Sequence, residues 1–149
     1  MVDPATAVAL PVSVSTYREW GWPVRGSADQ VLLDLGAECV AVVLPARPAR
    51  AVTAILAGHD RRASVLVNPG APQERTLVAG EPYGVPLPWP TGVRLVTGTL
   101  AVPPSTTPFG SLRWEQLPPD QRLSGCREID IFGAVHTTLR AAADTGYGR

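Results

Sequence analysis

The chain contains no lysine, so each of its 13 basic residues is an arginine. Its 13 acidic residues balance them to a formal net charge of zero. A protein that coats nucleic acid through bulk charge needs a basic surface, and here only a local patch of arginines would supply one. The chain also lacks any apolar run near the roughly 20 residues of a membrane helix, so we expect no membrane partner.

Cysteine and histidine are scarce as well. Cys39 and Cys126 have neither CxxC nor metal-ligand spacing, so we expect two small buried hydrophobic side chains, no metal site and no cofactor. His59 and His136 fall at a helix end and beside a helical apolar stripe, where structural roles suffice. Asp3 stands where the basic region of a secretory signal would lie, which favours a cytoplasmic protein.

The composition that is present is typical of one folded domain. The 149 residues are 45% hydrophobic and 17% charged, and no linker divides them. The 16 prolines and 14 glycines predict short elements and much irregular backbone. We therefore expect residues 1–149 to form a single domain.

Two helices are predicted in the first quarter of the chain. Pro11 suits the first position of a helix over residues 11–20, which Gly21 would end. Ser27-Ala28-Asp29-Gln30 matches a capping box and predicts a second helix that runs through residues 31–36.

Two further helices follow from apolar residues at helical spacing. Ala49, Val52, Ile55 and Leu56 predict a helix that Gly58 ends. A last helix is predicted over residues 129–143, within a C-terminal helical section at 120–143, and residues 144–149 read as a flexible tail. The expected buried stripe of this helix consists of Phe132, Val135 and Leu139.

Strands are predicted between these helices. Residues 39–44 form a continuous β-prone apolar run, which is typical of a central strand covered on both faces. Residues 64–67 and 76–78 flank the turn signal Asn68-Pro69-Gly70 and are expected to pair as a hairpin.

Later strands are expected at residues 93–96 and 99–102, with an edge-like strand at 111–116. Residues 82–90 hold four prolines and predict a loop of polyproline character. The order of elements indicates an α/β or α+β fold, a single two-layer domain with a mixed sheet and flanking helices.

Two proline-containing motifs carry a family resemblance. Val102-Pro103-Pro104-Ser105 ends a strand at a double proline and is followed by Arg113-Trp114, while Gly21-Trp22-Pro23-Val24 lies near the start. Together they resemble the N-terminal domain of bifunctional DNA primase/polymerases, the prim-pol family, over residues 17–119. The resemblance implies a prim-pol-like fold and a link to DNA replication.

The catalytic pattern of that family is missing. Prim-pol domains carry two metal-binding acids on the central strand, whereas this chain has the aliphatic run Val40–Leu44 there, with Glu38 before it and Asp34 in the preceding predicted helix. Where the family has a nucleotide-contacting histidine, residues 70–75 contain none. Two-metal chemistry needs oxygen ligands close to the phosphates, so the resemblance implies a pseudoenzyme without catalytic residues.

Four arginines are candidates for contact with nucleic acid or nucleotide. Arg47, Arg50, Arg61 and Arg62 surround the predicted helix at 49–56 against one acid, Asp60. They could form a patch of modest size, which we expect to be an ordinary solvated face; the alternative, which the family resemblance alone implies, is contact with phosphates.

Three further candidates come from the motifs and the loop. The double proline leaves Ser105 free to bond local backbone or a ligand, and Arg113 belongs to the later motif. Trp22 and Trp114 are expected in the core, whereas Trp89, between two prolines, is the tryptophan expected to be most exposed. It would anchor a partner or stack on a base, or else tuck against its own domain.

These observations lead to a ranked set of functions. The first is a catalytically inert prim-pol-like domain that binds nucleic acid or acts as a replication-associated accessory protein. The alternative is a protein-interaction or regulatory module that uses the loop at 82–90 and keeps only the fold. The third is an active primase/polymerase that depends on Asp34 or Glu38.

Overall fold

Strand β3 (Cys39–Pro45) lies inside the main sheet of the computed structural model, which describes residues 13–144. Val40, Val42 and Leu44 belong to one buried hydrophobic cluster, and Cys39 and Ala41 belong to a second. Because alternate residues of a strand point to opposite faces, β3 is covered on both sides. The predicted central, doubly covered strand is confirmed.

The main sheet has five strands in the order β10-β4-β5-β3-β6. Its other members are β4 (Ser64–Val67), β5 (Glu74–Gly80), β6 (Arg94–Val96) and β10 (Arg113–Gln116). Neighbouring strands are antiparallel throughout, and within residues 13–144 parallel pairing is limited to one bridge, Gly80 to Arg127. The predicted β4–β5 hairpin and the edge position of β10 are confirmed.

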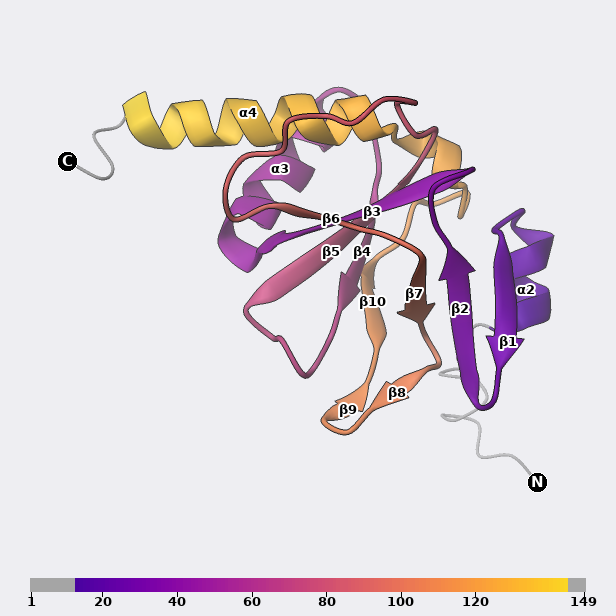
Figure 1. Ribbon diagram of the computed structural model, residues 1–149. Helices are drawn as coiled ribbons and strands as arrows, with labels where there is room; N and C mark the ends of the chain where they lie inside the picture. Colours follow the sequence, from indigo (N-terminus) through magenta and orange to yellow (C-terminus); the bar gives the residue numbers. More distant parts are fainter. Residues whose placement is uncertain (1–12, 145–149) are drawn as a thin grey trace.

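Helices α3 (Ala46–Gly58) and α4 (Glu128–Asp144) cover one face of this sheet (Figure 1). Both helices were predicted. The buried stripe of α4 is Ile131, Ala134 and Val135, whereas Phe132 is half-buried and Leu139 is 38% exposed. The prediction was right for Val135 and wrong for Phe132 and Leu139. Apolar residues at 131, 132, 135 and 139 are compatible with two helix rotations, and the structure shows the one that buries Ile131.

A smaller sheet and a short helix cover the other face. The sheet has the order β1-β2-β7, with β1 (Val24–Ser27), β2 (Gln30–Asp34) and β7 (Thr99–Val102). Helix α2 (Val14–Glu19) packs beside β1. Tyr17, Trp22, Leu33 and Val102 are buried here together with Ala41 and Val78 of the main sheet. The domain is α+β, in agreement with the predicted class.

The helix predicted from the capping-box pattern is wrong. Ser27 pairs with Gln30 across a tight turn, with Ala28 at φ 53°, and the following residues form β2. Val31 and Leu33 are buried while their neighbours are not, so the apolar period is two rather than 3.6. Pairing of β2 with both β1 and β7 outweighs the local cap signal.

Helix α2 begins later than expected, at Val14, where the Ser13 hydroxyl accepts a hydrogen bond from the Thr16 N–H at 3.3 Å. The predicted first residue, Pro11, and the tail beyond Asp144 lie outside the described residues. No helix within residues 13–144 combines the length and apolar character that crossing a membrane requires.

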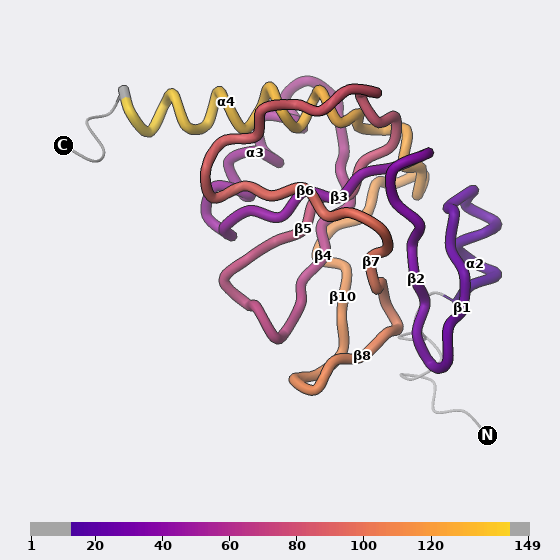
Figure 2. The backbone as a smooth tube through the Cα atoms, viewed as in Figure 1, coloured from indigo at the N-terminus to yellow at the C-terminus, as the bar shows by residue number. Residues whose placement is uncertain are grey.

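The proline-rich segment 81–93 is a loop, as predicted, and follows α4 along its length (Figure 2). The Tyr83 N–H donates to Glu128 Oε1 at 2.8 Å, and the Trp89 ring packs edge-on against Phe132 with centroids 5.1 Å apart. The remaining short elements are β8 (Thr106–Thr107), β9 (Gly110–Ser111) and the 3-10 turn η1 (Leu123–Gly125). The loop is thus attached at both ends of its path.

Candidate functional site

The two motifs that carry the prim-pol resemblance meet in space. The rings of Trp22 and Trp114 lie 5.5 Å apart, and Tyr17 lies 5.2 Å from Trp22. The Tyr17 hydroxyl donates to the Pro103 carbonyl at 2.7 Å and accepts from Trp114 Nε1 at 2.8 Å. Burial raises the pKa of Tyr17, which keeps its hydroxyl neutral. These motifs therefore build a hydrogen-bonded core.

Ser105, at the end of the double-proline motif, is part of that core and not of a surface. It is fully buried, and its hydroxyl both accepts from the Val31 N–H at 2.8 Å and donates to the Val31 carbonyl at 3.1 Å. Of the two roles expected for this residue, bonding to backbone or to a ligand, the structure shows the first, because its hydroxyl donates to and accepts from the backbone of β2.

Strand β3 is filled with aliphatic side chains, and Val40 to Leu44 are all buried. Asp34 is at the end of β2, not on a helix, and pairs with Arg25 at 3.2 Å. Glu38 is exposed just before β3. Among residues 13–144 no three histidine, cysteine, aspartate or glutamate side chains gather in a way that would hold a metal ion.

Both cysteines are buried free thiols, as predicted. Burial raises the pKa of Cys39 to about 12, with smaller contributions from Glu38 and Asp34. Burial also raises the pKa of Cys126 to about 12. The thiols are consequently protonated at neutral pH and act as core residues.

The four candidate arginines around α3 form two pairs instead of one patch. Arg47 and Arg50 lie in the first turns of the helix, and Arg61 and Arg62 follow its end. A helix of 13 residues is about 20 Å long at 1.5 Å per residue. The predicted single cluster was therefore wrong, because the length of the helix separates the pairs.

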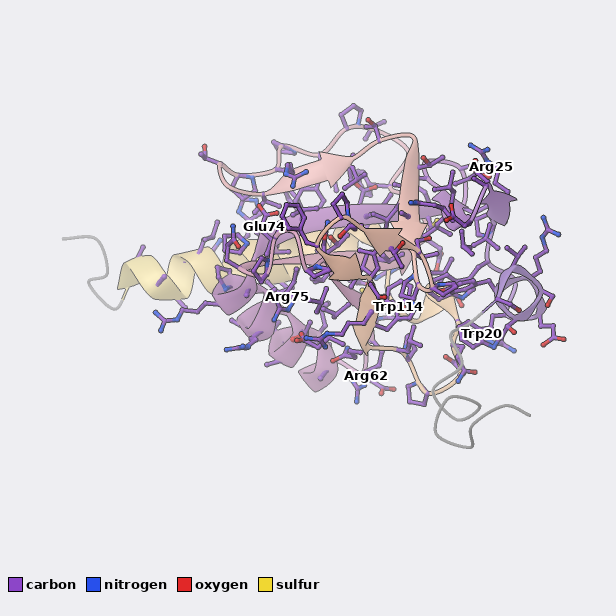
Figure 3. The ribbon with its side chains drawn as sticks, turned by 90° about the horizontal axis from the view of Figure 1, so that it is seen from below. Trp20, Arg25, Arg62, Glu74, Arg75 and Trp114 are labelled. Carbon is purple, nitrogen blue, oxygen red and sulfur yellow. The ribbon has the colours of Figure 1, made fainter. Side chains whose placement is uncertain are left out.

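The candidate arginines differ in their partners. Arg47, Arg50 and Arg113 are exposed and Arg62 is half-buried, and none of them forms an ion pair with a carboxylate in residues 13–144. Arg61 approaches Asp130 at 3.7 Å. Figure 3 shows Arg62 and Arg25 at well-separated places on the molecule.

Arg61 reaches the start of α4 because α3 ends in a tight reversal. Asp60 takes φ 59°, and the Arg61 N–H donates to the Leu56 carbonyl at 2.8 Å. This backbone path is a common way to end a helix. It directs the chain toward Asp130, whose pKa is lowered mainly by a hydrogen bond from Arg127.

Trp89 is not the most exposed part of its loop. Its ring packs on the helix-side cluster, and its Nε1 is buried without a hydrogen-bond partner among the described residues. Phe132 continues the contact to His136, with centroids 4.4 Å apart. The exposed large hydrophobic side chains of the loop are instead Tyr83 and Val85, at 50% and 59%. The flanking prolines suggested exposure, but they bend the loop back onto α4.

Several residues around these sites were missed by sequence reasoning. Arg127 and Asp130 form an i,i+3 ion pair at the start of α4, a spacing that was visible in the sequence. A separate hollow of about 550 Å³ gathers acids from distant segments opposite Arg122, namely Glu19, Glu38, Glu81 and Asp120. Nothing in local spacing joins those four acids.

No protein-family model, curated protein or solved structure matches this chain. The likeness to prim-pol domains therefore stands on the motifs at 21–24, 102–105 and 113–114. The residues that remain accessible for binding are the arginines around α3, Arg113 on β10 and the exposed part of the loop at 81–93.

Proposed function

We propose that this chain is a catalytically inert, prim-pol-like domain that binds single-stranded nucleic acid along α3, as a replication-associated accessory protein. The observation that carries the proposal is the set of unpaired arginines at both ends of one helix. Arg47 and Arg50 at its start and Arg62 beyond its end have no carboxylate at ion-pair distance within residues 13–144. Arg62 donates one N–H to the Arg61 carbonyl at 3.1 Å, and the other donors of a guanidinium without a carboxylate partner are available for phosphate oxygens.

The spacing of these arginines favours a polymer over a single phosphate group. The pairs are separated by roughly the helix length, about 20 Å. One phosphate cannot contact both ends, whereas a strand of several nucleotides lying along the helix contacts each in turn. Zero net charge then makes the binding local and sensitive to salt.

The proposed lack of catalysis rests on what occupies β3. Val40, Val42 and Leu44 pack into the helix-side core, and Ala41 packs into the other. A carboxylate at any of these positions would be buried among apolar groups, which is unfavourable without a partner. The strand therefore serves as core, and binding is the function left for the scaffold.

The test is salt-dependent binding of a fluorescently labelled single-stranded oligonucleotide to the full chain. Arg47, Arg50 and Arg62 are changed together to Gln, and a matched variant changes Arg18, Arg25 and Arg94 instead. Both variants lose the same charge, so a difference between them reports position. We expect the first to weaken binding and to lower the slope of log affinity against log salt by about 2, since each phosphate contact contributes about 0.7.

Equal effects of the two variants would contradict a site along α3 and indicate nonspecific charge. No binding of the natural chain at low salt would contradict the proposal altogether. Metal-dependent nucleotide incorporation that Asp34→Asn or Glu38→Gln abolishes would contradict the absence of catalysis.

A protein-interaction role is the second candidate, and the anchored loop at 81–93 favours it. Tyr83 is half exposed and Val85 is more than half exposed, yet the loop is attached to α4 by contacts with Glu128 and Phe132. Apolar side chains on a fixed backbone lose little freedom when a partner covers them. Val85→Asp tests this role better than Trp89→Ala, which would remove the attachment of the loop. A defined protein complex that Val85→Asp abolishes and the α3 arginine variant retains would favour this candidate.

A further inference from the structure

A cleft of about 460 Å³ lies between α3 and α4, beside the reversal that ends α3. Its lining is mixed. Ile55 and Leu56 from one helix and Ile129 and Ala134 from the other are apolar, whereas Asp130 and Thr137 of α4 are polar. His59 and Arg61 line the same cleft from the end of α3. The cleft thus combines apolar side chains with a few polar groups, a combination that small-molecule sites use.

Arg61 retains its hydrogen-bond donors at the edge of this cleft. Asp130, the nearby acid, is occupied by Arg127: the Arg127 N–H and Nε donate to Oδ2 at 2.9 and 3.1 Å, and one terminal nitrogen donates to Oδ1 at 2.9 Å. Arg61 Nε lies 3.7 Å from Oδ2, which is an ion contact but too long for a hydrogen bond. The carboxylate therefore orients Arg61 without using its donors.

Two guanidinium groups lie close to one carboxylate at this edge. Arg61 and Arg127 share Asp130, and Glu81 also acts on Arg127, so among the carboxylates of residues 13–144 the positive charge of Arg61 is offset only by the shared one and by its sequence neighbour Asp60. The carbonyls at the end of α3 do not offset it fully, because Leu56 and Ala57 already accept hydrogen bonds from the N–H groups of residues 59–61. The Arg61 side chain is 41% exposed, which leaves it reachable from solvent.

We propose that the α3–α4 cleft binds a small oxyanion with an apolar body, either a phosphate monoester or a carboxylate. The planar fork of Arg61 holds two oxygens of such a group side by side. The apolar body then packs between Ile55 and Ala134, where it is removed from water. This site is independent of the proposed nucleic-acid function, whose test leaves Arg61 unchanged.

The experiment titrates the full chain by calorimetry with phenyl phosphate, benzoate, inorganic phosphate and benzyl alcohol. We expect phenyl phosphate or benzoate to bind at least tenfold more tightly than inorganic phosphate, because the ring adds buried apolar area. Benzyl alcohol, which lacks the charge, should not bind at the same concentrations. The stronger of the two aromatic anions identifies the oxyanion as phosphate or carboxylate.

Two variants locate the site. Arg61→Gln should weaken the aromatic anion at least tenfold, whereas Arg62→Gln, the matched control, should not, since Arg62 lines a different hollow with Pro118 and Asp120. Gly133 lines the cleft and has open space at its Cβ position. Gly133→Leu should therefore fill the cleft and abolish binding even if Arg61 is intact.

The proposal is overturned if neither aromatic anion binds at millimolar concentration, or if inorganic phosphate binds as tightly as both. It is also overturned if Arg61→Gln and Gly133→Leu both bind like the natural chain. Thermal unfolding of each variant confirms that it is folded before its titration is interpreted.

Discussion

The buried tyrosine and tryptophan side chains on the two faces of the main sheet differ in hydrogen bonding, although the motif side, covered by α2 and the small sheet, also holds Ser64 Oγ, which is buried without a partner among residues 13–144. On this motif side, Trp22 Nε1 donates a hydrogen bond to the Gln121 carbonyl at 2.7 Å. The Tyr17 hydroxyl donates to the Pro103 carbonyl and accepts from Trp114 Nε1. On the helix-covered face, Trp89 Nε1 is buried without a partner among residues 13–144. Arg61 on that side also lacks a hydrogen-bonded acceptor for its side chain in the same part of the chain.

The difference separates the scaffold from the surface available for binding. Trp22, Val102 and Trp114 of the motifs that resemble prim-pol domains pack on the side covered by α2 and the small sheet, whereas Arg113 of the same motifs is exposed. Arg47, Arg50 and the α3–α4 cleft lie at the helices that cover the other side, outside those motifs. The resemblance is thus carried largely by core residues, and the two binding proposals rest on other residues.

The largest expected effect comes from removing one hydroxyl on the motif side. Tyr17→Phe leaves the Trp114 N–H and the Pro103 carbonyl without their partner in a buried site. We expect the free energy of unfolding in urea to fall by about 2–3 kcal/mol, since each buried unpaired group costs about 1–3 kcal/mol. Tyr83→Phe is the control, because Tyr83 is half exposed. Equal losses in the two variants would contradict the distinction between the faces.

Ser105→Ala should have the next largest effect. The Val31 N–H and carbonyl both lose the Ser105 hydroxyl inside the core, so we expect a loss of about 1–2 kcal/mol in the free energy of unfolding. Oligonucleotide affinity should stay unchanged, measured where the variant is fully folded. Ser111→Ala, at an exposed position, is the matched control. A drop in affinity without a drop in stability would return Ser105 to the binding surface.

Gly133→Ala should stabilise the helix-covered side by a smaller amount. Gly133 lies inside α4, and an added Cβ meets nothing within 4 Å. Alanine is favoured over glycine within a helix by about 0.5–1 kcal/mol, and urea unfolding should show a gain of that size. Gly36→Ala provides the contrast, because φ is 107° there and alanine is strained. A loss of stability in Gly133→Ala would contradict the open space at the Gly133 Cβ position in the α3–α4 cleft.

The two thiols give the smallest effect at neutral pH and report on one face each. Cys39 belongs to the motif-side cluster and Cys126 to the helix-side cluster. Both folded pKa values are raised to about 12, so this contribution to stability is complete below the unfolded value near pH 8.5 and decreases as pH rises toward 12. The free energy of unfolding should therefore fall above about pH 9, and less so in a variant with both cysteines changed to Ala.

Alkylation at pH 8 then compares the faces directly. Both thiols should react slowly in the folded chain and quickly in urea. Cys126 should react before Cys39, because it follows η1, whose backbone hydrogen bonds at Gly125 and Cys126 are 3.4 Å long. Faster reaction of Cys39 would show that the motif side is the more easily opened of the two.

Sequence reasoning succeeded where one period dominates a segment. The apolar run of β3 and the helical spacing of α3 have no competing pattern, and both elements were predicted. Residues 27–36 contain both a cap signal and an alternating Val31, Leu33 pattern, and only pairing with β7 decides between them. That pairing joins residues far apart in sequence, which local rules do not include.

The sequence could predict which residues belong to the candidate site, but not which other residues they contact. Arg61 was singled out for its charge, but its relation to Asp130 depends on how α3 ends and where α4 begins. Trp89 was expected to be exposed because of its prolines, while its contact with Phe132 depends on the path of the whole loop. Both outcomes are set by tertiary packing, which the spacing of neighbours does not determine.

The most direct test of the account measures oligonucleotide affinity against salt for three chains of equal length. They are the natural chain, the Tyr17→Phe variant under conditions where it is folded, and the variant with Arg47, Arg50 and Arg62 changed to Gln. The account predicts that Tyr17→Phe matches the natural chain, while the arginine variant loses about 2 from the slope of log affinity against log salt. An arginine variant that binds like the natural chain, with Tyr17→Phe impaired, would contradict the assignment of binding to the helix-covered side.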